Sequence, residues 1–167
     1  MLNDERVIFG KPNTLLLSRQ GYNLVDMHTH SNYSDSLTKV RNLLKIAKKR
    51  RVGVSITDHN AIGGVVEAYK NNNNVLVVPG IEVTCSSEGH ILLYFYNLTD
   101  LQEFYHRFIK NRKSKLPYGL TSLKISELLD LTDDYNCVRS LAHPCSVGKF
   151  GIYKDMPELL TKLPANW

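Results

Sequence analysis

The chain has 167 residues, 43% of them hydrophobic and 22% charged, so it can bury the core of one domain and is too apolar for an intrinsically disordered protein. Its net charge of +5 admits phosphorylated ligands or nucleic acid, although the basic residues are widely spread. Three cysteines without CxxC spacing argue against a disulfide framework and a zinc ribbon. Because the sequence has neither a run of about 18 apolar residues nor a leader-like start, we expect a soluble cytoplasmic protein with no membrane partner.

Segments with the patterns of strands and helices alternate along most of the chain. Residues 1–21 contain several breakers and predict an N-terminal extension with at most a short element at residues 13–19. Strands are predicted at residues 23–28, 52–57, 75–84 with a break at Pro79, 91–96 and 137–142. Helices are predicted at residues 38–51 with Thr38 as the cap, 62–70, 99–111, 121–131 and 157–163. This alternation predicts an α/β fold with parallel βαβ units.

The end of the first predicted strand carries the segment DMHTH at residues 26–30. Residues two apart on a strand face the same side, roughly 7 Å from each other, so His28 and His30 can share an ion only where the backbone bends. The small polar loop at residues 31–36 lets the chain fold back, which can bring Asp35 into the same cluster. This segment therefore predicts part of a metal site.

Further candidate ligands lie at the ends of later predicted strands. His59 follows the second strand, Glu82 lies in the second half of the third, and His143 closes the fifth. In parallel α/β folds, ligands bind beyond the carboxyl ends of the strands, where the loops converge. His90 departs from this rule because it precedes the fourth strand, unless that strand runs antiparallel.

These ordered motifs resemble those of the PHP (polymerase and histidinol phosphatase) superfamily. They are residues 26–35, ITDH at 56–59, PGIE at 79–82, GH at 89–90 and AHP at 142–144. The resemblance implies an α/β PHP domain at residues 22–167, forming the N-terminal part of a distorted (β/α)7 barrel. It also implies a site of about two to three divalent ions, zinc, manganese or iron. The ligands implied are His28, His30, Asp35, His59, Glu82, His90 and His143.

The activity that the resemblance implies is hydrolysis of a phosphoester by metal-activated water. The expected substrate is a small phosphorylated metabolite or a nucleic-acid end. Asp58 and His59 are the candidate catalytic residues, because Asp58 could orient a ligand or transfer a proton beside His59. Asp26 could do the same near His28. Each of the two aspartates could equally be a structural hydrogen-bond partner.

The sequence departs from the family at its final motif. An Asp-x-His normally ends the barrel, but no histidine follows His143, and five strands are predicted where seven are expected. We therefore expect a partial or truncated barrel whose site is completed by a further C-terminal segment or a partner. The alternative is a noncatalytic PHP-like module that binds metal or another molecule.

Several other reactive or charged residues have simpler interpretations. His106 lies within a predicted helix without a partner motif, which favours a surface or packing role. Cys85 and Cys145 lie close to candidate ligands in the sequence, but inert thiols are the simpler prediction. The basic stretch at residues 110–115 is interpreted as a solvated loop, with phosphate or nucleic-acid binding as the alternative.

Overall fold

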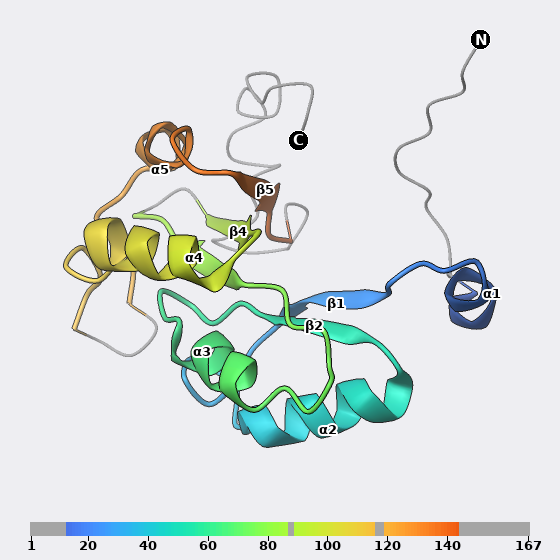
Figure 1. Cartoon of the computed structure of the whole chain (residues 1–167). Helices are drawn as coiled ribbons and strands as arrows, with labels where there is room; N and C mark the ends of the chain where they lie inside the picture. The colour runs from blue at the N-terminus through green and yellow to red at the C-terminus, as the bar shows by residue number, and fades with distance from the viewer. Residues whose placement is uncertain (1–12, 87–88, 116–118, 144–167) are drawn as a thin grey trace, which may run out of the picture.

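The computed structural model describes residues 13–86, 89–115 and 119–143, and its first half contains a parallel pair of strands (Figure 1). After α1 (Thr14–Arg19) come β1 (Val25–Thr29), α2 (Val40–Arg50), β2 (Gly53–Ile56) and α3 (Gly63–Lys70). β1 pairs with β2 in parallel, with Val25 opposite Gly53. The predicted βαβ unit is confirmed here, because the helical connection lets the second strand run in the same direction.

The second half contains a sheet of three antiparallel strands. Its strands are β3 (Gly80–Thr84), β4 (His90–Phe95) and β5 (Cys137–Leu141), in that order across the sheet. Between β4 and β5 the chain forms α4 (Leu98–Phe104), which continues as the π-helix η1 (Tyr105–Ile109), and then α5 (Ile125–Thr132). The prediction of parallel units is wrong for β4, because only five residues separate it from β3 and a parallel crossover needs a dozen or more.

Two isolated bridges align the two sheets. Val54 pairs with Val77 and His59 pairs with Glu82, both in parallel. β3 therefore runs in the same direction as β2, and so does β5, since it is antiparallel to the reversed β4. The ends of β1, β2, β3 and β5 thus meet the start of β4 at one edge. Because β4 runs in the opposite direction, its first residue, His90, lies at the same edge as the carboxyl ends of the other strands. His90 is therefore no exception to the rule for strand ends.

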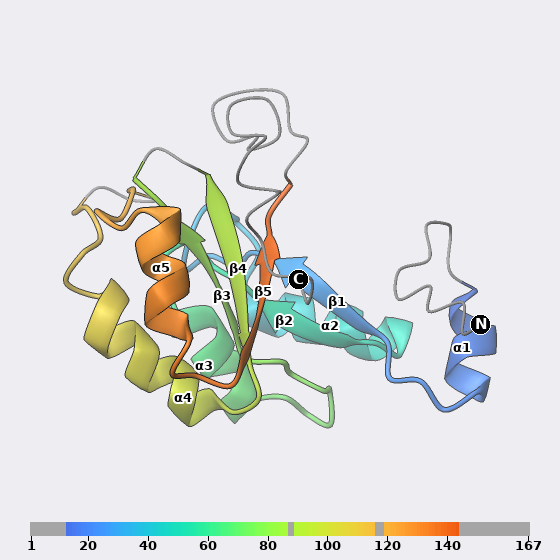
Figure 2. The same ribbon diagram turned by 90° about the horizontal axis from the view of Figure 1, so that it is seen from above.

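The described strands are arranged as a mixed α/β fold and close no barrel within residues 13–86, 89–115 and 119–143. Figures 1 and 2 show α2 and α3 beside β1 and β2, while α4 and α5 cover the three-stranded sheet. On α2 the buried side chains are Val40, Leu44 and Ala47, spaced three to four residues apart as on one face of a helix. Packing of the helices against the strands therefore holds in place the edge at which the ends of β1, β2, β3 and β5 meet the start of β4.

Aromatic side chains fill the core between α4 and β4. The ring centroids of Phe95 and Phe104 lie 5.5 Å apart, and those of Phe104 and Tyr135 lie 5.2 Å apart.

On the opposite face of β4, the hydroxyl of Tyr94 donates a hydrogen bond of 2.9 Å to the carbonyl of Met27 on β1. This bond links the two sheets close to the candidate ligands.

Some predicted boundaries are wrong, because tertiary hydrogen bonds take up the residues concerned. Thr38 does not cap α2, which begins after Lys39; its carbonyl accepts a hydrogen bond from the N–H of Asn32, 3.0 Å away, and holds a loop instead. Thr121 donates its N–H and its hydroxyl to the carbonyl of Thr84, so α5 begins only at Ile125. Of the predicted strand at 75–84, β3 takes up the part from Gly80 onward, while Val77 in the first half forms only an isolated bridge with Val54.

The predicted helix at residues 157–163 and Cys145 lie outside the described residues. Among the residues that the structure describes, no helix is long and apolar enough to cross a membrane.

Candidate metal centre

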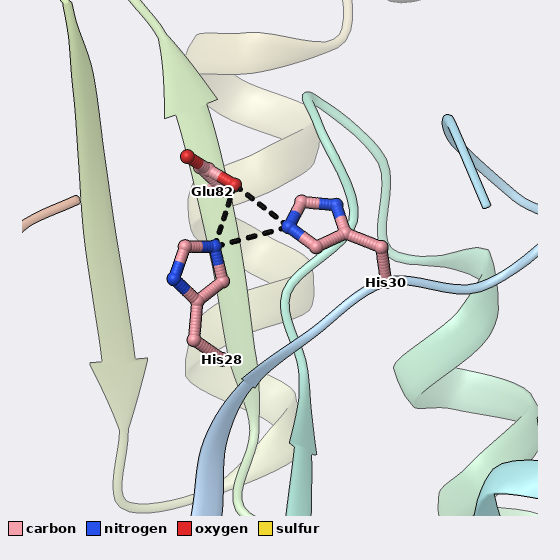
Figure 3. A group of neighbouring side chains, drawn as sticks. All are labelled: His28, His30 and Glu82. Carbon is pink, nitrogen blue, oxygen red and sulfur yellow. Dashed lines mark hydrogen bonds and ion pairs between the residues drawn. The ribbon is translucent and has the colours of Figure 1, made fainter. Parts of the chain in front are cut away.

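Two histidines at the end of β1 point toward one carboxylate on β3. Figure 3 shows His28, His30 and Glu82 as a triangle of side chains. The Nε2 atoms of the two histidines lie 3.0 Å apart, and each lies 3.0 Å from Oε2 of Glu82. The pairing of β1 is irregular between Asp26 and Thr29, the bend that lets two alternate residues converge. Three donor atoms are thus placed around one point.

A second group of donors extends from His30 toward the solvent. Oδ1 of Asp35 lies 2.9 Å from Nδ1 of His30, and Oδ2 lies 3.5 Å from Nε2 of His59. His59 is held in place by Thr84, whose hydroxyl lies 3.0 Å from Nδ1 of the ring. The side chain of Asp35 is 45% exposed, so this end of the cluster opens to solvent.

The third group comes from the reversed strand and from the end of β5. Nδ1 of His90 lies 2.8 Å from Oε1 of Glu82, and Nε2 of His143 lies 3.3 Å from the same oxygen. The N–H of Ala142 donates to the carbonyl of His90 at 3.1 Å, which holds the two histidine segments side by side. The antiparallel pairing of β4 with β5 therefore brings these donors together.

The charge of Glu82 dominates the electrostatics of the cluster. The side chain is buried, and burial by itself would raise its pKa. Hydrogen bonds with His28, His30 and His90 outweigh this effect and hold the pKa of Glu82 far below its usual range. Its ion-pair partners in the described part of the chain are all histidines. The cluster is therefore built around an ionised carboxylate.

The histidines around Glu82 differ in how readily they take up a proton. Burial lowers the pKa of His59, and the charges of His30 and His90 lower it further against the opposing attraction of Glu82. For His30, burial also acts to lower the pKa, but the hydrogen bond and the charge of Glu82 outweigh it and raise the pKa. Burial would raise the pKa of Asp35, yet the charges of His30 and His59 lower it. The centroids of neighbouring histidine rings in the cluster lie 4.7–5.0 Å apart.

The donor atoms of the cluster form groups that could hold metal ions. Three sets of donors have ligand atoms within 4.8 Å of one another, namely His28 with His30 and Glu82, His30 with Asp35 and His59, and His59 with Glu82 and His90. Neutral imidazoles and ionised carboxylates are the forms that bind metals. All seven residues predicted as ligands lie in this cluster, and their role as ligands stays a prediction. His106 lies away from it, exposed on η1.

The candidate catalytic residue Asp58 is hydrogen-bonded to the loop that follows β1. Its buried carboxylate accepts hydrogen bonds from the backbone N–H and the hydroxyl of Ser31, and from the hydroxyl of Ser34, each 2.7 Å long. These bonds fix the loop that carries His30 and Asp35. These contacts are those of a structural hydrogen-bond partner, one of the two roles that the sequence offered; the catalytic role of Asp58 stays a prediction. The sequence did not predict that Ser31 and Ser34 donate hydrogen bonds to Asp58. Only the small polar composition of their loop pointed in that direction.

Comparison with protein families assigns the fold that carries this cluster. The PHP domain family matches residues 26–162 of this chain. The chain belongs to the PHP domain family. The match begins at Asp26, in the segment with the first two histidines, and continues past His143, so all seven clustered residues of this PHP domain fall within it.

A relative of this PHP domain matches it over part of both chains. An uncharacterized protein of Methanocaldococcus jannaschii is 41% identical over the matched part, which covers 43% of this chain and 50% of the relative. The chain thus spans about half the length of the curated relative that it matches.

Two crystal structures share the fold. One is Endonuclease Q in complex with a 27-mer duplex substrate with an abasic lesion at the active site, with a TM-score of 0.70 and 20% identity. The other is the lesion-specific endonuclease from Pyrococcus furiosus, with a TM-score of 0.67 and 19% identity. In each case 86% of this chain covers 40% of the other. At these identities the likeness concerns the fold alone.

Proposed function

We propose that this PHP domain hydrolyses a phosphoester with the help of bound divalent ions. The observation that carries the proposal is the convergence of five imidazoles on the buried carboxylate of Glu82, with Asp35 at the open end. The substrate class that we propose is a small phosphorylated metabolite or a nucleic-acid end. Family membership supports the proposal, because the clustered residues lie within the matched PHP domain.

The donor set accommodates zinc, manganese or iron, since imidazole and carboxylate ligands suit each of them. Glu82 presents both of its oxygens to histidines, Oε2 to His28 and His30 and Oε1 to His90 and His143, so it would hold metal together with both pairs. Ions held there would supply an activated water and positive charge opposite the phosphoryl oxygens. No nucleophilic side chain is needed for that reaction.

The protein's own groups then have separate tasks. Because Glu82 is buried, its interactions with the surrounding histidines are not weakened by water. Asp58 holds the loop that carries His30 and Asp35 through three short hydrogen bonds. Asp35, whose side chain is 45% exposed, would be open to a ligand from solvent.

We also propose how the described strands relate to the whole fold. The five strands, with residues 22–167 as the domain and 1–21 as an extension, would form part of the distorted (β/α)7 barrel. A further C-terminal segment or a partner would supply the donors of the Asp-x-His motif that is lacking after His143.

The experiment that tests the function measures metal content and turnover together. The purified chain is loaded with zinc, manganese or iron in turn, and bound metal is counted by mass spectrometry while bis(p-nitrophenyl) phosphate is the probe. We expect His28→Ala to lower both metal content and turnover. His106→Ala is the matched control, because His106 is an exposed histidine outside the cluster.

The outcomes separate the enzyme from the noncatalytic alternative. Bound metal and turnover that fall together in His28→Ala support phosphoester hydrolysis. If the protein, tested together with the segment or partner that completes its site, binds metal fully but hydrolyses neither this probe nor a phosphorylated nucleic-acid end, it is instead a metal-binding module. Unchanged metal content in His28→Ala would reject the assigned ligands.

A further inference from the structure

A cavity of about 400 Å³ lies beside the Asp35 and His59 end of the metal centre. It belongs neither to the ligand triangle of Figure 3 nor to the hydrophobic core. Polar and basic residues line it, among them Tyr33, Ser34, His59, Asn60, Lys113 and Lys115. Because His59 is both a wall of the cavity and a member of the cluster, a ligand bound at the metal centre can extend into this space.

The position of Lys113 is fixed relative to the metal centre. Its ammonium donates a hydrogen bond to the carbonyl of Asn60 at 3.3 Å, directly after His59 in the chain. The same ammonium lies 5.7 Å from the centroid of the Tyr105 ring. These two contacts hold the positive charge at the wall of the cavity.

The backbone around Lys113 is tied to a neighbour of the cluster. Lys113 forms a bridge with Thr121, and Thr121 donates two hydrogen bonds of 2.9 Å to the carbonyl of Thr84. The hydroxyl of Thr84 in turn lies 3.0 Å from Nδ1 of His59. The basic loop and a candidate metal ligand therefore share one anchor, so their separation is set by the fold.

The charge of the cavity is positive. None of the described residues that line it is acidic, and in the described ranges neither Lys113 nor Lys115 forms an ion pair with a carboxylate. The nearest acid of the cluster, Asp35, is already paired with His30 and His59. Ammonium groups that lack a carboxylate partner beside a polar cavity favour a bound anion.

Building on the proposed function, we propose that Lys113 and Lys115 bind a second phosphate group of the substrate while the metal centre binds the phosphoryl group to be cleaved. The substrate is then a phosphoester that carries a neighbouring phosphate. A small bisphosphate and the next phosphate of a nucleic-acid strand share this chemistry. The proposal gives the basic stretch at 110–115 the phosphate-binding role that the sequence left as an alternative.

The first test needs no turnover. Inorganic phosphate is titrated into the metal-free protein, and the amide signals of residues 113–115 are followed by NMR. We expect saturable shifts in the native chain and an affinity about tenfold weaker in Lys113→Gln and in Lys115→Gln, since charge-assisted hydrogen bonds contribute this much. Lys110→Gln is the matched control, because Lys110 is exposed and does not line the cavity. Equal affinity in all four proteins would overturn the proposal.

The second test compares substrates on the metal-loaded protein. Its probes are p-nitrophenyl phosphate, thymidine 3′,5′-bisphosphate and a 5′-phosphorylated hexadeoxynucleotide. We expect the ratio of kcat/KM for a probe with a second phosphate to that for p-nitrophenyl phosphate to fall about tenfold in Lys113→Gln and Lys115→Gln, but not in Lys110→Gln. The probe whose ratio falls identifies the source of the second phosphate.

The two tests separate this inference from the function on which it rests. Phosphate binding that depends on the two lysines, without hydrolysis of any probe, would reject the enzyme and keep the anion site. Hydrolysis with unchanged ratios would keep the enzyme and reject the second phosphate site.

Discussion

The carboxylate of Asp58 at the end of β2 accepts the backbone N–H of Ser31 at 2.7 Å, which ties the loop after β1 to the neighbouring strand. The hydroxyls of Ser31 and Ser34 donate to the same buried group. One side chain therefore satisfies three donors in the loop that presents His30 and Asp35. This relationship makes the loop's geometry depend on Asp58.

We expect Asp58→Asn to lower the free energy of unfolding of the metal-free protein by about 2 kcal/mol, because an amide nitrogen cannot accept one of these buried hydrogen bonds. The affinity for zinc should also fall, by roughly tenfold or more, since the loop no longer holds two ligands in place. Urea unfolding and a zinc titration measure the two effects. Asp134→Asn, at an exposed position, is the control; equal stability of the two variants would contradict this role of Asp58.

Gly64→Ala tests the packing behind the same anchor. A methyl group at this position of α3 would overlap Oδ2 of Asp58 and come within 2.5 Å of Oγ of Ser31. In an exposed helix the change from glycine to alanine stabilises by up to about 1 kcal/mol. Here we expect a destabilisation of about 1–3 kcal/mol, measured by urea unfolding. A gain in stability would show that the anchor can move without cost.

Tyr94→Phe tests the link between the two sheets and its dependence on pH. Burial raises the pKa of Tyr94 to about 12, and the charges of Glu82 and Asp26 act in the same direction. Since the folded state holds this proton more tightly than the unfolded state does, its stabilising effect is complete below about pH 10 and is lost as the pH rises toward 12.

We therefore expect the native chain to lose about 2 kcal/mol more stability than Tyr94→Phe between pH 10 and pH 12. Below pH 10 the variant should be less stable by about 1 kcal/mol, because it lacks the hydrogen bond to Met27. Denaturant unfolding at a series of pH values measures both differences. Tyr69→Phe is a control on an exposed tyrosine, and parallel curves for the native chain and Tyr94→Phe would disprove the raised pKa.

Glu82→Gln tests the charge at the centre of the cluster. The amide keeps the size of the side chain but removes the charge that five histidines face, so we expect zinc affinity to fall by at least about tenfold. Zinc should raise the melting temperature of the native chain much more than that of the variant, because a ligand stabilises only the state that binds it. Calorimetry with and without zinc measures this. Glu127→Gln on the exposed face of α5 should behave like the native chain.

Residues near one another in the sequence specified much of the candidate site and of the fold. His28, His30 and Asp35 lie within one strand end and its loop, so their types and spacing already predicted a cluster. The strand patterns at 23–28, 52–57 and 137–142 agree with β1, β2 and β5 within one or two residues, because the pattern of a strand is a local property of the sequence. The family motifs also predicted the PHP domain, which the match over residues 26–162 confirms.

Other features depend on contacts between distant segments, and no local pattern encodes them. The direction of β4 follows from pairing on both sides, and it alone explains how His90 reaches Glu82. Asp58 meets Ser31 across 27 positions, and Lys113 meets Asn60 across 53. By itself, then, the sequence determined which side chains could bind metal, since their chemistry is intrinsic. Only the tertiary structure decided which of the polar residues became anchors and where the positive cavity lies, because buried hydrogen bonds and unpaired charges arise when separate segments are packed together.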